Sequence, residues 1–595
     1  MKLRTSFFNG TVFKKDLTRF APAWGLYTLL LLLGLVNTAS SPWGHLQAGN
    51  IVELIPVMAV LNFLYAAVNA QLLYGDLFNS RMCNALHAMP LRRECWFITH
   101  TTAGLIFGLA PIALVAVAGF GVLNLGAGWS LPLWWGVGAA LQYVFFFGTA
   151  VLCVFLAGNR FAHGVLYGLV QFFAVLVYWM AVSLYQPLLP GIRMNTADFF
   201  PFSPICYMLD SPDLIETVTR EILDEAGTWC GTEILAITPG GDWGYYALCA
   251  GIGILALVLG LELYRRRELE CAGDFLAFRK MEMPFLVLMT FCAGSFAHAF
   301  TELVFGVSSR YIFLAAGLVV GFFGGLMLLR RTNRVFSRNA ITGFAILVAG
   351  FALTLVLTWL DPLGITRYVP KAEELTEISL GSDQIEYYAP GGRCVLTESE
   401  DVGIILDVHR QIISGEAEEV GAGFDMEDSY YWVGADLHYT LSNGRKVSRY
   451  YIINSASEAA QALKPYYSSL EYVLGIMEAE IPEYARKVDG IRSSDLEGKW
   501  EPEDYAEFDR FTDPEPMLRA LAADCAAGNM AQNHAYHANG IGNEDDDEII
   551  INLEFCVETR EGYQRYTWLN IYESCTNTLA WMEDNGLYIP DLHRE

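Results

Sequence analysis

Residues 133–157 read LWWGVGAALQYVFFFGTAVLCVFLA, an apolar run without one charged side chain. A helix rises 1.5 Å per residue, so about 20 apolar residues cross a hydrocarbon core about 30 Å thick. Runs of similar character occupy residues 22–40, 51–74, 97–123, 164–186, 243–263, 284–306, 311–329 and 340–359. Lipid cannot satisfy open backbone groups, and the alternation of a membrane barrel is absent. The pattern therefore predicts a polytopic α-helical membrane protein with about nine spans.

The segment that precedes the first run has two interpretations. Residues 1–21 place apolar side chains near helical spacing with lysines and an arginine between them. We expect a cytoplasmic amphipathic helix in the membrane interface, and the alternative is a basic tail. The first run also resembles the apolar part of a signal peptide. However, residues 22–40 are long for that role and residues 37–40 form a weak cleavage site, so we expect a retained span.

Charge divides the chain into two parts. Residues 361–595 hold 46 of the 65 acidic residues and 17 of the 38 basic ones, whereas residues 1–360 are nearly neutral. The first part is suited to lipid and the second to water. Within residues 1–360, 18 of the 21 basic residues fall in segments that face the cytoplasm if the N-terminus is inside. This asymmetry follows the positive-inside rule, and an odd number of spans then puts residues 360–595 outside a bacterial cell.

The acidic part is predicted to be an extracellular α+β domain. Alternating apolar and polar residues flank Asn443-Gly444, the preferred pair for a two-residue type I′ hairpin. Residues 455–474 have a helical pattern. Residues 543–548 are mostly acidic but lack the ligand spacing of a calcium loop, so we expect a solvated turn there. We likewise expect no metal at His534 and His537.

Two connections between spans carry unusual residues. Residues 75–96 join the second and third spans through a short amphipathic segment that is closed by Pro90 and flanked by bases. The segment is interpreted either as a docking surface for a partner or as a loop on the lipid headgroups. Residues 187–242 join the fifth and sixth spans outside, and the aromatic, proline-rich run around Phe202, Ser203 and Pro204 predicts a short re-entrant or interfacial element.

Few ionisable residues lie inside the spans. His298 and Glu302 share one face of the seventh span, near its outer end. We expect a structural or interfacial role for this pair in preference to ion coupling. Cys206 and Cys230 lie in the long external loop, where a disulfide between them and two free thiols are equally open alternatives.

Several activities lack their motifs. The chain has no phosphate-binding loop, no His-Glu-x-x-His and no Gly-x-Ser-x-Gly. The first six spans carry mainly amides near the midplane, which is poor for an ion-coupled carrier. The sequence therefore predicts neither an enzyme nor a cofactor or metal site in this chain, and no nucleic acid as a partner. If the protein transports a substrate, the energy comes from another subunit.

The order of these features resembles the membrane subunit of an ABC exporter of the type-2 class. The interfacial helix, the segment 75–96, the Pro111-containing third span and the Phe202-Ser203-Pro204 element recur in that order over roughly residues 1–265. The resemblance implies that residues 22–263 form a six-span permease domain. It also implies that the connection between spans two and three contacts the ATPase through Asp76, Arg81, His87, Pro90, Leu91, Arg92 and Arg93.

The resemblance also implies partners and leaves parts of the chain unexplained. An ABC ATPase subunit would carry ATP and Mg²⁺, and a second permease copy or a paralogue would complete the translocation pathway in the lipid membrane. Three additional spans within residues 264–359 and the domain 360–595 exceed a six-span unit. The alternative function is a non-transporting receptor whose extracellular domain binds a ligand or a cell-wall component.

Overall fold

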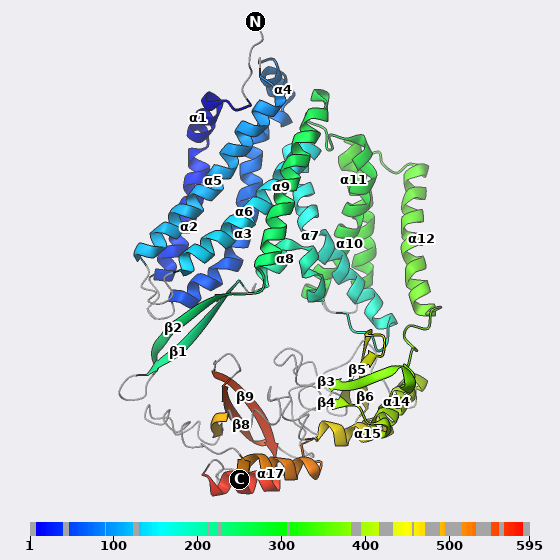
Figure 1. The fold of residues 1–595 in the computed structure, drawn as a ribbon. Helices are drawn as coiled ribbons and strands as arrows, with labels where there is room; N and C mark the ends of the chain where they lie inside the picture. The colour runs from blue at the N-terminus through cyan, green and yellow to red at the C-terminus, as the bar shows by residue number, and fades with distance from the viewer. Residues whose placement is uncertain are drawn as a thin grey trace. The chain divides into compact units, whose positions relative to one another are not determined.

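A computed structural model describes residues 7–39, 47–89, 91–122, 130–194, 196–210, 214–223, 229–305, 310–381, 394–415, 432–454, 457–469, 488–493, 515–530, 549–558 and 564–586. The chain divides into two compact units. The first comprises residues 1–183, 195–222 and 230–351, and the second comprises residues 184–194, 223–229 and 352–595. Most described residues of the first unit are helical (Figure 1).

Each predicted span coincides with a helix. The long helices are α2 (Ala21–Ala39), α3 (Gln47–Tyr74), α5 (Arg93–Val122), α6 (Leu131–Leu156), α7 (Arg160–Tyr185), α9 (Trp243–Arg266), α10 (Glu282–Phe305), α11 (Arg310–Arg330) and α12 (Arg338–Leu360). Among the described residues, eight helices are long and apolar enough to span a membrane by themselves. α2 reaches this criterion together with α1 (Gly10–Arg19), from which it is bent by 60°. The predicted number of nine spans therefore depends on that bent pair.

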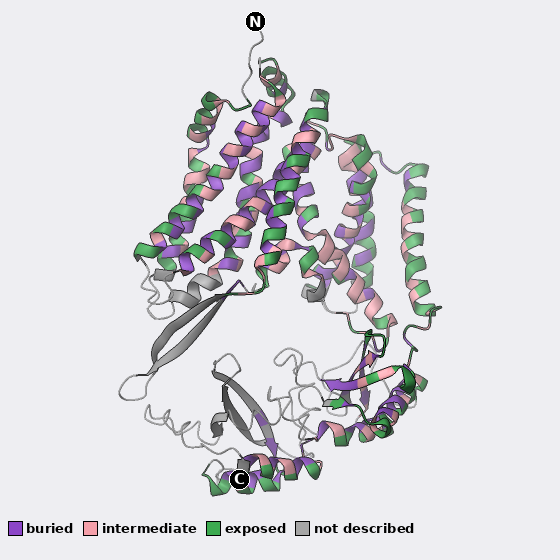
Figure 2. Cartoon of the chain, viewed as in Figure 1, coloured by how far each residue is buried: buried purple, intermediate pink, exposed green. Residues whose placement is uncertain are grey.

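α6 is the centre of the first unit. It packs against α3, α5 and α9. In its most apolar stretch 72% of the residues are buried, whereas in that of α12 only 6% are buried (Figure 2). A separate close contact joins α10 and α11. A Cβ atom at Gly317 would lie 2.7 Å from the carbonyl oxygen of Ala293, and one at Gly321 would lie 2.9 Å from that of Met289. Glycines four residues apart thus let the two helices approach closely, as small residues do between membrane helices.

Shorter elements connect these helices. They are η2 (Gly75–Phe78), α4 (Ser80–His87), η4 (Gln186–Leu188), η5 (Thr196–Phe202), α8 (Pro204–Leu209), β1 (Ile215–Leu223), β2 (Trp229–Pro239), η6 (Leu269–Cys271) and η7 (Arg279–Met281). β1 and β2 form a two-stranded sheet inside the connection 187–242. No sequence pattern above predicts this sheet.

The second unit contains both strands and helices, as predicted for an α+β domain. One sheet has the strand order β4 (Cys394–Leu396), β3 (Leu375–Gly381), β5 (Trp432–Leu441), β6 (Lys446–Asn454), and another has the order β7 (Val488–Ser493), β8 (Ile549–Glu558), β9 (Gln564–Tyr572). The helices are α14 (Ser399–Ser414), α15 (Glu458–Tyr467), α17 (Glu515–Ala526) and α19 (Thr576–Asp584), with η9 (Ala372–Glu374) before β3. α14 and α15 pack against each other, and their apolar residues share one core with β3, β5 and β6.

The predicted hairpin is present, but its turn differs from the prediction. The Leu441 N–H donates to the Arg445 carbonyl and the Gly444 N–H donates to the Leu441 carbonyl, so three residues form the loop. Gly444 has a φ of +80°, whereas Asn443 is not among the described residues with a positive φ. A type I′ turn needs a positive φ at both central residues, so the two-residue type I′ turn was wrong. A three-residue loop that ends in a left-handed glycine takes its place.

Some predictions concern parts of the chain that the structure does not describe. Residues 534, 537 and 543–548 lie outside the described residues, as does Pro90. The backbones of Glu302 and Cys230 are described, but their side chains are not.

Candidate docking segment at one end of the helix bundle

We call residues 75–96, which join α3 to α5, the docking segment. Its short helix forms because the open N–H groups of its first turn find acceptors nearby. α3 continues into η2, and Asn79 then begins α4 by accepting hydrogen bonds from the N–H groups of Arg81 (3.0 Å) and Met82 (3.4 Å). Asparagine is a preferred residue at this position because its short side chain reaches the open N–H groups of the first turn. The result is a two-turn helix that lies across one end of the first unit (Figure 1).

One face of α4 is fixed to the end of α9. Cys83 is buried, and the Nδ1 atom of His87 lies 2.8 Å from the Cys83 carbonyl oxygen. A carbonyl can only accept, so Nδ1 carries the proton and Nε2 accepts from the Tyr264 hydroxyl at 3.1 Å. Burial lowers the pKa of His87, and the charges of Arg93 and Arg267 lower it further. His87 is therefore a neutral link between α4 and α9.

Arg93 joins the docking segment to α9 a second time. Its Nη1 atom donates to the carbonyl oxygens of Tyr264 (2.9 Å), Arg265 (3.0 Å) and Arg267 (2.9 Å). The last carbonyls of a helix have no partner within the helix, and a cation there also meets the negative end of the helix dipole. Arg93, the first residue of α5, thus caps the end of α9.

Arg267 makes the same kind of contact with the end of α6. It is 3% exposed, and its Nη1 atom donates to the carbonyl oxygens of Val154 (3.0 Å), Phe155 (3.2 Å) and Ala157 (2.8 Å) at the end of α6. The docking segment therefore binds the end of α9 through Arg93, and the residue after α9 binds the end of α6 through Arg267. We call this pair of contacts the arginine relay.

α6 and α9 are packed as closely as backbones allow. A Cβ atom at Gly148 would lie 2.1 Å from the Gly253 carbonyl oxygen, and one at Gly253 would lie 2.5 Å from the Val144 carbonyl oxygen. Such distances exclude any side chain at either position. The two helices are therefore in direct backbone contact at these glycines.

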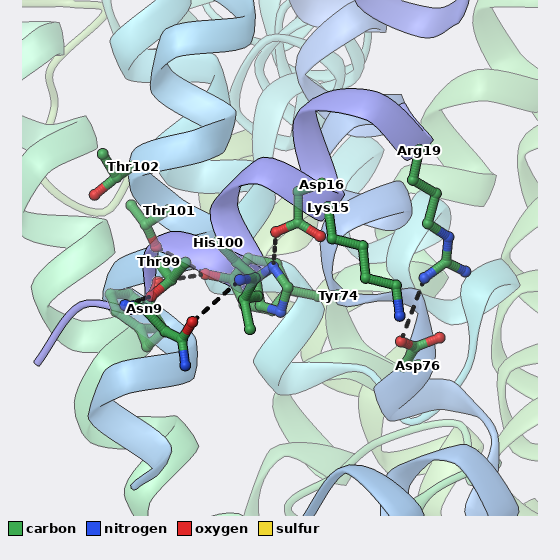
Figure 3. Close-up of polar contacts among 12 residues, drawn as sticks. Asn9, Lys15, Asp16, Arg19, Tyr74, Asp76, Thr99, His100, Thr101 and Thr102 are labelled. Atoms are coloured by element: carbon green, nitrogen blue, oxygen red, sulfur yellow. Dashed lines mark hydrogen bonds and ion pairs between the residues drawn. The ribbon is translucent and has the colours of Figure 1, made fainter. Parts of the chain in front are cut away.

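The amphipathic helix α1 is attached beside the docking segment (Figure 3). Asp16 is buried, and its Oδ2 atom lies 2.7 Å from Nδ1 of His100 in α5. The Asn9 N–H donates to the Thr99 hydroxyl at 3.1 Å. On the exposed side of α1, Arg19 forms a longer ion pair of 3.8 Å with Asp76 of η2. α1 is thus held to both flanks of the docking segment.

The other face of α4 is open. Met82 in α4 and Met89, two residues after the helix, are each 48% exposed, and the basic side chains of Arg81 and Arg92 are exposed as well. Exposed methionines form adaptable apolar contacts, and flanking arginines add charged ones. The structure therefore combines a fixed inner face with an apolar and basic outer face.

The predicted docking residues divide between these two faces. Arg81 and Arg92 lie on the outer face, whereas His87 and Arg93 bind α9 and Leu91 is half-buried against the bundle core. Asp76 pairs with Arg19 on α1. The roles of these residues toward a partner stay predictions.

The segment around Phe202, Ser203 and Pro204 forms two short helices, η5 and α8. Ser203 is buried, and its hydroxyl donates to the Gln171 carbonyl oxygen at 2.6 Å, which ties the turn between η5 and α8 to α7. Pro204 begins α8, and Phe202 is 67% exposed. The Cys206 sulfur lies at hydrogen-bond distance from the Ser203 hydroxyl (3.4 Å). The Cys230 side chain is not described, so their disulfide stays a prediction.

Inside the bundle, polar side chains bind one another. The Tyr27 hydroxyl donates to Asn62 (2.6 Å), Asn62 donates to Gln142 (3.1 Å), and Gln142 donates to the Tyr246 hydroxyl (3.3 Å). His298 is buried, with Nε2 2.8 Å from the Ser183 hydroxyl. Such pairs hold membrane helices together. Among the described residues, no group of three or more His, Cys, Asp or Glu side chains is arranged to hold a metal ion.

Sequence reasoning missed Asp16, Asn79, His100 and Arg267. Asp16 is the one acidic residue within positions 1–21, and its place on the apolar side of a basic helix was a usable signal. Arg267 follows two other arginines, Arg265 and Arg266, and nothing in the sequence distinguishes the buried one. Comparison with family models, with characterised proteins and with solved structures finds no match to this chain.

Proposed function

We propose that this chain is the membrane subunit of an ATP-binding cassette exporter in a bacterial cell membrane. A separate ATPase subunit docks on residues 75–96, and a second copy of the chain or a paralogue completes the translocation pathway. The N-terminus and α4 face the cytoplasm, and the domain 360–595 lies outside. ATP and Mg²⁺ bind to the partner, so this chain has no enzymatic activity in transport.

The two-faced α4 is the observation that supports this proposal most strongly. Met82 in α4 and Met89 just after it are exposed, although a surface loop needs no apolar residues, and the segment is fixed to α9 through His87 and Arg93. A patch of this kind on a rigid helix suits a protein partner. A loop that merely rests on lipid headgroups needs no such attachment to α9.

The arginine relay supplies a route for the coupling. A displacement of α4 would be transmitted to α9 through the Arg93 contacts and to α6 through the Arg267 contacts. Because Gly148 and Gly253 bring α6 and α9 into direct backbone contact, the pair would move together. A partner that closes on ATP binding could therefore shift the central helix of the bundle.

The orientation has independent support from charge. Arg81 and Arg92 on the docking segment, and Arg265 and Arg266 at the end of α9, belong to the same end of the first unit (Figure 1). Clusters of bases mark the cytoplasmic side of membrane proteins. The partner ATPase would meet the bundle on this side.

The test is co-purification from the native membrane followed by ATPase assays. We expect an ATPase subunit to copurify with the wild-type chain, and Met82→Glu/Met89→Glu to lower its recovery and its stimulated ATP turnover by at least about tenfold, which corresponds to about 1.4 kcal/mol. Met281→Glu is the matched control, because Met281 is an exposed methionine in η7, outside the docking segment. Recovery of the intact chain without any nucleotide-binding subunit would instead favour the receptor function.

A further inference from the structure

Three chemically complementary side chains lie in a row on the second unit. Asp436 and His438 are two residues apart in β5, so their side chains are on the same face of the sheet. The register pairs His438 with Ser448 of β6. The neighbouring residues Leu437 and Tyr439 face the apolar core with α14, so the row is on the opposite face.

The distances in this row match a nucleophile, a base and an orienting acid. The Ser448 hydroxyl oxygen lies 2.8 Å from His438 Nδ1, and His438 Nε2 lies 3.0 Å from Asp436 Oδ1. A carboxylate can only accept, so Nε2 carries the proton and the lone pair of Nδ1 faces the serine hydroxyl. The side chains of His438 and Asp436 are 13% and 8% exposed, whereas Ser448 is exposed. The base is thus sheltered and the nucleophile is accessible.

The surroundings of Ser448 include a cation over the ring of Tyr450 and a backbone N–H on the outer side of β6. The Arg193 guanidinium carbon is 5.1 Å from the ring centre of Tyr450, which is two residues from Ser448 and on the same face of β6. The Tyr450 N–H donates to the Gly191 carbonyl on the side of β6 away from β5, at 3.1 Å. Because N–H directions alternate along a strand, the Ser448 N–H points to that same side. A backbone N–H and a cation are the groups that stabilise a developing oxyanion.

We propose that Ser448, His438 and Asp436 form an acyl-transfer site whose substrates are peptides or esters bound in extended form. β6 is an edge of its sheet among the described strands, and Gly191 already pairs with it as one short bridge. An extended chain that continues this pairing presents its carbonyl to Ser448. The activity is independent of ATP-driven transport.

The chemistry balances without a cofactor. The Ser448 oxygen attacks the carbonyl carbon, its proton passes to His438 Nδ1, and the carbonyl electron pair moves to the oxygen beside the Ser448 N–H. The tetrahedral species then expels the amine or alcohol, which takes the proton from His438. Water repeats the sequence on the acyl-serine and releases the acid. Asp436 acts as a positioning residue that holds the imidazole in the reactive tautomer.

A fluorophosphonate probe tests the site in the full-length protein. The serine oxygen displaces fluoride at phosphorus, and mass spectrometry locates the adduct. We expect labelling of Ser448 at least about 100-fold faster than of Ser442, an exposed serine in the same hairpin. His438→Gln should slow labelling by about the same factor, Ser448→Ala should abolish it, and Ser442→Ala should leave it unchanged.

The internal comparison keeps the test decisive if a variant unfolds. Ser448 and Ser442 react in the same wild-type molecule, so equal labelling of the two serines overturns the proposal. Labelling of Ser448 in His438→Gln at the wild-type rate also overturns it. Asp436→Asn should slow labelling while the thermal midpoint stays near that of the wild type, which a merely structural role would not produce.

Discussion

The Oδ2 atom of Asp16 lies 2.7 Å from the Nδ1 atom of His100, and this contact fastens α1 to α5. Both side chains are almost fully covered, with 6% and 10% of their surfaces exposed. The ring of Trp96 stacks on His100 at 5.4 Å. The amphipathic helix is therefore part of the packed bundle, in addition to any contact that it makes with lipid.

The first prediction concerns this contact. Asp16→Ala removes a buried acceptor from His100 and should lower the free energy of unfolding by about 1.5–3 kcal/mol. The thermal midpoint of the purified protein measures the effect. Asp76→Ala is the control, because the Arg19–Asp76 pair is longer (3.8 Å) and more exposed, and such pairs contribute little. Equal midpoints for the two variants would contradict the assigned role of Asp16.

The second prediction separates two adjacent arginines. Arg267→Ala leaves the carbonyls of Val154, Phe155 and Ala157 without their donor, and each unsatisfied buried group costs about 1–3 kcal/mol. Arg266→Ala removes a surface pair with Glu262 from a side chain that is 73% exposed. We expect a clear drop in the thermal midpoint for Arg267→Ala and almost none for Arg266→Ala. The reverse order would show that Arg267 does not hold the end of α6.

The third prediction concerns the contact between α6 and α9. Gly253→Ala places a methyl group 2.5 Å from the Val144 carbonyl oxygen, so the helices must separate. Gly251→Ala lies in the same helix, where nothing is within 4 Å of the added carbon. We expect Gly253→Ala to reduce the yield of folded protein in size-exclusion chromatography, and Gly251→Ala to match the wild type. A fully folded Gly253→Ala protein would rule out the tight backbone contact.

The fourth prediction is a pH dependence in the second unit. His409 is buried between the hydroxyls of Tyr439 (2.8 Å) and Tyr451 (2.9 Å). Burial lowers the pKa of His409 to about 3, with help from the charges of Arg449 and Arg410. The unfolded chain, with a pKa near 6.5, binds the proton more readily, so the stability that His409 contributes is complete above about pH 6.5 and is lost as the pH falls toward about 3.

Hydrogen exchange in α14 measures this effect, since His409 lies in that helix. We expect protection in the wild type to fall between about pH 6.5 and pH 3. His409→Gln removes the titrating group and should flatten this part of the profile at a lower overall stability. An unchanged slope in the variant would assign the pH dependence to other groups.

The length of the apolar runs was sufficient to predict the long helices, because a run of about 20 uncharged residues has few alternatives. It could not predict the arginine relay. Arg267 and its acceptors at residues 154–157 are more than 100 positions apart in the sequence. The exposed residue next to it, Arg266, is also an arginine. Only packing in three dimensions distinguishes these two arginines.

The turn type of the hairpin determines which residues face each other across β5 and β6. A two-residue turn at Asn443-Gly444 would pair His438 with Arg449, whereas the three-residue loop pairs His438 with Ser448. A register shift of one residue changes every cross-strand neighbour. The sequence therefore predicted the hairpin correctly, but the wrong turn type left the Ser448–His438 contact invisible.

Photo-crosslinking from position 82 in living cells tests the central proposal most directly. A photoreactive residue replaces Met82, and the control carries it at Met281 in η7. The proposal predicts a crosslink from position 82, and none from position 281, to a protein that contains a phosphate-binding loop. The absence of such a protein at position 82, or its equal capture from both positions, would contradict docking of an ATPase on α4.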